Sequence, residues 1–155
     1  MKRILSMVIT GILAGAFAFT GLAPASASPR TGALHIEKNC SGFAGEAGGF
    51  CTITSSNLKM IKRGSQVIYA DAADFTIGQL DTDIVLDTGH GNSAFGHVFL
   101  NFATGTGTVT FDGGTGKFED FHASADVSFI GDNTHPDWAW DGEYSFSPEI
   151  GIAHV

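Results

Sequence analysis

Short apolar runs with a two-residue period are the feature of this sequence that most constrains its fold. After residue 28, apolar and polar residues alternate over short stretches, and glycines or Asp-Gly pairs separate these stretches. Alternation over about four to eight residues is typical of β-strands with one buried face, whereas an amphipathic helix repeats every three to four residues. No long helical pattern occurs in this part of the sequence. The sequence therefore predicts an all-β domain.

Eight such runs are predicted as strands: 33–38, 51–57, 65–70, 80–86, 95–102, 107–111, 117–129 and 138–146. The turn signals between them are Arg63-Gly64, Asp87-Thr88-Gly89, Asp112-Gly113-Gly114 and Asp132-Asn133 with Pro136, all of residue types that favour turns. Strands joined in succession by short turns indicate an antiparallel meander. We expect an eight-stranded barrel rather than a sandwich, because a closed sheet leaves no unpaired edge.

The N-terminal segment has the three parts of a cleavable secretory signal. Lys2 and Arg3 precede an uncharged apolar stretch over residues 4–22, and small residues then lead to Ala25-Ser26-Ala27. We expect cleavage after Ala27, a single β-barrel domain over residues 28–155, and a secreted, periplasmic or extracellular location. A retained membrane helix is the alternative, but the stretch contains glycine and threonine and is followed by Pro24.

The predicted mature domain is strongly acidic. All 16 acidic residues of the chain follow residue 27, whereas two of its eight basic residues precede it. An acidic surface repels phosphate backbones, and no basic stripe reverses this locally. We therefore expect no nucleic-acid partner and no membrane association after cleavage of the signal.

Cys40 and Cys51 both lie in the predicted mature domain. In an exported chain, two cysteines eleven positions apart most simply form a disulfide, which stabilises the fold by about 2–3 kcal/mol. A metal site or a reactive thiol pair is the alternative. No histidine has the spacing of a ligand partner, so we expect neither a metal nor another cofactor.

Two predicted strands show a clear division between faces. Trp138, Trp140 and Tyr144 share one face of the last strand, and His122 and Asp126 share the polar face of the strand before it. Such alternation indicates one packed face and one face that is solvated or lines a polar cavity. The polar set is therefore either surface-exposed or part of a pocket.

A further group lies on the predicted strand 95–102. Phe95, His97, Phe99 and Asn101 share a face, and a polar pair among aromatic rings is typical of groups that orient a ligand in an apolar pocket. A hydrogen-bonded core histidine is the alternative. The residues that we expect to contact a small hydrophobic ligand are Phe95, His97, Phe99, Asn101, His122, Asp126, Trp138, Trp140 and Tyr144.

The sequence Asp87-Thr88-Gly89 matches half of the active site of an aspartic protease. That chemistry needs two carboxylates that share a proton, so a single copy would require a symmetric dimer. A turn at the end of a strand is the simpler interpretation, since aspartate and glycine favour turns.

The segment Gly113-Gly114-Thr115-Gly116-Lys117-Phe118 resembles the GGTGxF segment of the allene oxide cyclase and dirigent-like β-barrels. Residues 51–58 and 140–146 are similar to bacterial exported members of this group, and the resemblance covers most of residues 33–148. It implies a calycin-like, eight-stranded antiparallel barrel, often oligomeric, with a pocket for hydrophobic small molecules. Plant relatives guide cyclisation or radical coupling. No catalytic residue is carried over to this chain.

Three functions are compatible with these observations. The first is an exported barrel, non-enzymatic or weakly catalytic, that binds a small hydrophobic ligand. The second is a cyclase, an isomerase or a guide of radical coupling, with His97, His122 or Asp126 as acid–base groups. The third is a non-catalytic protein-interaction module with a filled interior. A homo-oligomer is compatible with each of them.

Overall fold

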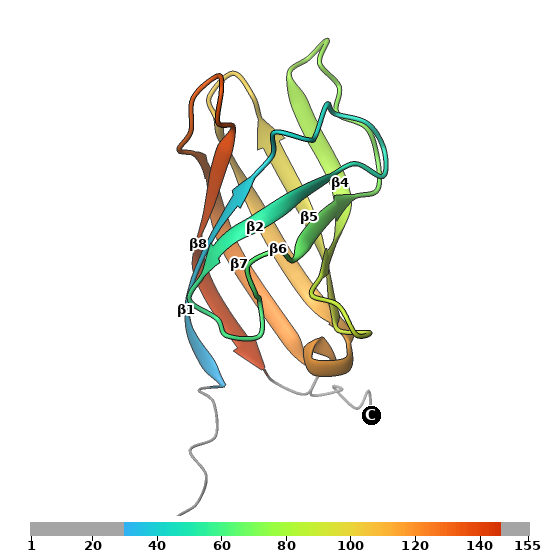
Figure 1. The fold of residues 1–155 in the computed structure, drawn as a ribbon, viewed down its shortest axis with the longest axis vertical. Helices are drawn as coiled ribbons and strands as arrows, with labels where there is room; N and C mark the ends of the chain where they lie inside the picture. The colour runs from blue at the N-terminus through green and yellow to red at the C-terminus, as the bar shows by residue number, and fades with distance from the viewer. Residues whose placement is uncertain (1–29, 147–155) are drawn as a thin grey trace, which may run out of the picture.

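The computed structural model describes residues 30–146, which form a closed barrel of eight antiparallel strands (Figure 1). Each strand pairs with the next along the chain, and β8 pairs with β1 to close the ring. The predicted all-β, eight-stranded antiparallel barrel is confirmed. The predicted signal segment, residues 1–27, lies outside the described residues. The strands are β1 (Thr31–Asn39), β2 (Phe50–Ser56), β3 (Gln66–Tyr69), β4 (Gln79–Asp87), β5 (Ser93–Asn101), β6 (Thr106–Thr115), β7 (Phe121–Phe129) and β8 (Asp137–Phe146).

The predicted boundaries are wrong around the link between β6 and β7. Asp112-Gly113-Gly114 is not a turn, because β6 continues through it to Thr115. The pairing with β5 shifts there, so that two residues of β6, Asp112 and Gly113, oppose Phe95. Gly113 has φ 77°, the conformation that a glycine supplies in this kind of β-bulge. The chain then turns through a short 3₁₀ helix, η1 (Gly116–Phe118), so β7 begins four residues later than predicted.

Alternation along each strand fills the interior of the barrel. Apolar side chains from all eight strands point inward, while the outer face carries mostly polar and acidic residues. The largest fully buried side chains are Trp140, Tyr69, Phe118 and Phe121. The described residues include no helix with the length and apolar character needed to cross a membrane.

The two ends of the barrel are closed in different ways. At the lower end in Figure 1, η1 lies beneath the strands, and its Phe118 packs edge-on against Phe121, with ring centroids 5.3 Å apart. At the upper end, the loop between β1 and β2 is tied by a disulfide between Cys40 and Cys51. The predicted disulfide is confirmed.

Candidate functional site

Lys38 is the only charged residue with a buried side chain among residues 30–146. It lies near the upper end of β1, in phase with Leu34 and Ile36, which also point inward. Strand geometry therefore directs its side chain into the barrel, and only 4% of the residue's surface remains exposed. An inward-facing lysine is an exception, because most side chains in the interior of the barrel are apolar.

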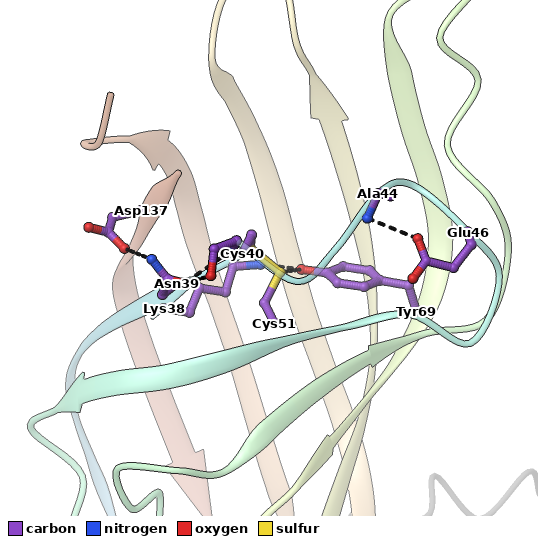
Figure 2. The surroundings of a disulfide bond; sticks show 9 residues. Lys38, Asn39, Cys40, Ala44, Glu46, Cys51, Tyr69 and Asp137 are labelled. Atoms are coloured by element: carbon purple, nitrogen blue, oxygen red, sulfur yellow. Dashed lines mark hydrogen bonds between the residues drawn. A yellow bond between two sulfur atoms is a disulfide. The ribbon is translucent and has the colours of Figure 1, made fainter. Parts of the chain in front are cut away.

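The ammonium group of Lys38 is surrounded by aromatic rings. Its Nζ donates a hydrogen bond to the hydroxyl of Tyr69 and lies 4.6 Å from the centroid of the Trp140 ring. The Tyr69 hydroxyl in turn donates to Sγ of Cys51, at 3.2 Å. Figure 2 shows the Lys38 and Tyr69 side chains meeting beside the disulfide. Phe43, from the disulfide-tied loop, stacks on the Tyr69 ring with centroids 4.6 Å apart.

No carboxylate within the described part of the chain forms a salt bridge with Lys38. The salt bridges there all involve histidine. Burial without a counter-charge lowers the pKa of Lys38 to about 7, because a charged amine is poorly solvated in an apolar interior. Burial also raises the pKa of Tyr69, so its hydroxyl keeps its proton near neutral pH.

The indole of Trp140 adds a third polar group to this cluster. Its Nε1 is buried and has no hydrogen-bond acceptor among the described residues. A buried donor without an acceptor typically costs about 1–3 kcal/mol. We refer to Lys38, Tyr69 and Trp140 together as the donor cluster, since each has at least one N–H or O–H that is unpaired or weakly paired.

A solvent-open hollow of about 440 Å³ lies at the upper end of the barrel. Phe102, Phe129 and Trp138 contribute its aromatic lining, and the Phe129 and Trp138 rings meet edge-on at 4.9 Å between centroids. Trp138 lies directly opposite Lys38 in the β1–β8 ladder. We call this space the upper hollow.

Exposed apolar side chains gather around the same end. Phe75 and Ile77 are each 64% exposed in the connection between β3 and β4, and Phe75 stacks on Phe102 at 5.5 Å between centroids. Ile130, which follows β7, is half exposed. Large apolar side chains clustered at one end of a small barrel are typical of a binding surface.

The residues predicted to bind a ligand lie on both faces of the barrel wall. Trp138, Trp140 and Tyr144 point inward from β8. The remaining six residues lie on the outer face, so the predicted set does not line one pocket. They are Phe95, His97, Phe99 and Asn101 on β5, and His122 and Asp126 on β7.

The outer set contains a histidine held between two carboxylates. His97 Nδ1 is 2.8 Å from Asp83 Oδ1, and its Nε2 is 2.7 Å from Asp81 Oδ1. These hydrogen bonds raise the pKa of His97. His97 and Phe95 also border a hollow of about 420 Å³ on the outer wall, which Asp83 and Asp112 line as well.

A third hollow, of about 600 Å³, opens at the lower end of the barrel and includes His122 and Tyr144 in its lining. The Nδ1 atom of His122 lies 2.9 Å from a carboxylate oxygen of Asp112. Asn101 instead stabilises the β5–β6 turn, because its Oδ1 accepts a hydrogen bond from the amide of Ala103 at 2.9 Å. Asp126 lies opposite Asp141 on the outer wall.

Asp87-Thr88-Gly89 begins the turn between β4 and β5. Oδ1 of Asp87 accepts a hydrogen bond from the amide of Gly89 at 2.8 Å, as aspartate commonly does in a turn. In the described ranges, no group of three or more histidine, cysteine or acidic side chains is arranged to hold a metal ion.

Lys38 and Tyr69 were not among the residues expected to form a site. The signal for Lys38 is present in the sequence, since a lysine two positions after Ile36 on an alternating strand must face the same side. The contact with Tyr69, 31 residues further along the chain, depends on barrel closure and has no local signal.

No protein-family model, curated protein or solved structure matches this chain.

Proposed function

We propose that this protein is an exported barrel that binds a small, largely apolar molecule in the upper hollow. The observation that carries the proposal is the aromatic lining of that hollow by Phe102, Phe129 and Trp138. Its volume of about 440 Å³ is within the range of small-molecule sites, which are mostly apolar with a few polar groups. The exposed Phe75 and Ile77 extend the apolar surface at this end.

The other two hollows suit an apolar molecule less well. The lower hollow is larger, but Glu143 and His122 contribute titratable groups to its lining, whereas the polar side chains that line the upper hollow are the hydroxyls of Thr104, Thr106 and Ser128. The hollow on the outer wall carries Asp83 and Asp112, whose carboxylates would have to be desolvated by an apolar ligand. The described residues that line the upper hollow include no charged one, and Trp138 among them is paired with Lys38 in the β1–β8 ladder.

Export and membership of the allene oxide cyclase and dirigent-like group are parts of the same proposal. The Cys40–Cys51 disulfide supports an oxidising compartment, since disulfides persist mainly outside the cytoplasm. A closed eight-stranded antiparallel barrel is the fold that the resemblance implies. We do not extend the proposal to catalysis, because His97 and His122, with their carboxylate partners, lie on the outer wall.

Calorimetric titration with naphthylmethanol, a neutral apolar probe, tests the proposal. We expect the wild-type protein to bind it and Phe129→Ala to weaken binding about tenfold, because one aromatic contact contributes about 1.4 kcal/mol. Phe99→Ala is the matched control: Phe99 is 38% exposed and Phe129 is 40% exposed, but Phe99 lies on the outer wall. Equal losses in both variants would overturn the proposal, and so would failure of the wild-type protein to bind either this probe or anionic probes with the same apolar body.

A further inference from the structure

We propose that the ligand of the upper hollow carries an anionic oxygen, and that Lys38, Tyr69 and Trp140 hold this oxygen inside the barrel. The inference rests on the proposed function, because it assumes that the upper hollow receives the apolar part of the ligand. It adds the chemical class of the ligand and the residues that recognise it.

The donor cluster has more hydrogen-bond donors than acceptors. A lysine ammonium has three N–H donors, and Lys38 uses one of them on the Tyr69 hydroxyl. The Tyr69 O–H is directed at a disulfide sulfur, which is a weak acceptor. The Trp140 N–H has no acceptor in the described structure. The cluster therefore has spare donors and lacks a strong acceptor, and an anionic oxygen is a strong acceptor with no hydrogen to donate.

The Lys38 amine also lacks a counter-charge in the described structure. Lys38 is buried in contact with two aromatic rings and has no carboxylate partner among residues 30–146. The rings stabilise the charged amine in part, and a counter-charge entering the site would stabilise it further. A carboxylate or an ionised phenol on an apolar body supplies that charge, while a neutral ligand of the same shape does not.

Trp138 connects the upper hollow to the donor cluster. It borders the hollow and is paired with Lys38 in the β1–β8 ladder, so the residue that lines the hollow and the residue that carries the amine are direct neighbours on adjacent strands. Directly paired residues on the same face have Cβ atoms about 4.5–5.5 Å apart. A ligand whose apolar body lies in the hollow must therefore displace the Trp138 indole for its oxygen to reach Lys38.

Calorimetric titrations at pH 6 with three naphthalene probes test this inference. Naphthoate carries a carboxylate, naphthol an ionisable phenol and naphthylmethanol a neutral alcohol, on the same apolar body. We expect the wild-type protein to bind naphthoate or naphthol at least tenfold more tightly than naphthylmethanol. Lys38→Met should remove this preference and Tyr69→Phe should reduce it. Lys62→Met, at an exposed lysine, should leave it intact.

The pH dependence distinguishes the two sources of the oxygen. Naphthoate is already ionised, so its affinity should fall as the pH rises above about 7, where Lys38 loses its proton. Naphthol brings its own proton and can give it to neutral Lys38, so its affinity should change little between pH 7 and 8. A preference that depends on Lys38 supports the inference with either pH profile, and the profile shows whether the anionic oxygen is a carboxylate or a phenolate.

Failure of the inference and failure of the proposed function give different results. If none of the three probes binds the wild-type protein, the proposed function is wrong. If all three bind with similar affinity, or if Lys38→Met keeps the preference, the upper hollow binds apolar molecules and the inference is wrong. Circular dichroism of each variant shows whether the barrel has folded.

Discussion

The upper and lower ends of the barrel are built from different side chains. At the lower end, Phe121 contacts Phe118, Phe111 and Phe146, with ring centroids 5.2–5.8 Å apart. Near the upper end, the inward positions include Lys38 and Thr82 as well as the hydroxyl of Tyr69. One end thus holds an aromatic cluster, and the other holds polar groups under a disulfide-tied loop.

The two ends of the barrel therefore differ in role: one mainly stabilises the fold, and the other carries the groups proposed to bind a ligand. Packed aromatic rings gain from burial without leaving polar atoms unpaired. Buried donors gain less, because each loses its hydration and the protein offers them few acceptors. The lower end therefore contributes more to the free energy of unfolding. The buried donors of the upper end lower that free energy, and ligand binding would account for their presence.

The largest effect should come from the lower end. Phe121→Ala should reduce the free energy of unfolding by about 3–5 kcal/mol, since the side chain is fully buried and its loss leaves a cavity. Urea unfolding followed by circular dichroism measures this change. Phe129→Ala, at a half-exposed ring of the upper end, should cost less than half as much. Equal losses would remove the distinction between the two ends.

Lys38→Met should change the free energy of unfolding in the opposite direction. Replacing the buried amine by an apolar side chain of similar length should raise the free energy of unfolding by about 1–4 kcal/mol at pH 6. The folded-state pKa of Lys38, about 7, lies below its ordinary value of 10.5, so the unfolded chain binds more protons between these values. Wild-type stability should therefore rise with pH above 7, by up to about 1.4 kcal/mol per unit.

The variant itself is the control for this pH dependence. Urea unfolding at pH 7, 8 and 9 should show a smaller slope for Lys38→Met than for the wild-type protein. If the two slopes coincide, Lys38 is not desolvated in solution. Its burial at the upper end would then not lower the free energy of unfolding.

The smallest effect should come from the outer wall. The pKa of His97 is raised by Asp83 and Asp81, so its contribution to stability is complete below pH 6.5 and is lost as the pH rises through the raised pKa. This dependence is opposite in sign to that of Lys38. The side chain is half exposed, so solvent screens the interaction, and His97→Gln should cost less than about 1 kcal/mol. An NMR titration of the ring protons measures the pKa, and a value at or below 6.5 would contradict the pairing.

Much of the fold could be predicted from residue alternation. Strands such as β4 and β8 have one apolar and one polar face, so their positions follow from the pattern. The bulge in β6 could not be predicted in this way, because Asp-Gly-Gly favours a turn and only the pairing with β5 shows that the strand continues. Local turn chemistry and tertiary pairing disagree there, and pairing determines the structure.

The site was harder to predict for two reasons. On β5, both faces carry apolar residues: Val98 and Leu100 point inward, while Phe95 and Phe99 point outward. Period-two alternation alone therefore does not determine which face lines the interior. For Lys38, the inward direction could be predicted from the alternation of β1. Its partners could not be predicted, because they come from β3 and β8.

The closure of β1 on β8 has a consequence for chain connectivity. Thr31 pairs with Ser145, and the amide of Phe146 donates to the carbonyl oxygen of Arg30 at 2.6 Å, so the two ends of the described chain meet. Each strand forms backbone ladders only with its two neighbours around the ring, and the ring has no preferred starting point. A circularly permuted chain, joined near Arg30 and Phe146 and opened at the turn around Gly91, would retain every ladder. The order of the strands along the chain can therefore change while the donor cluster keeps its geometry.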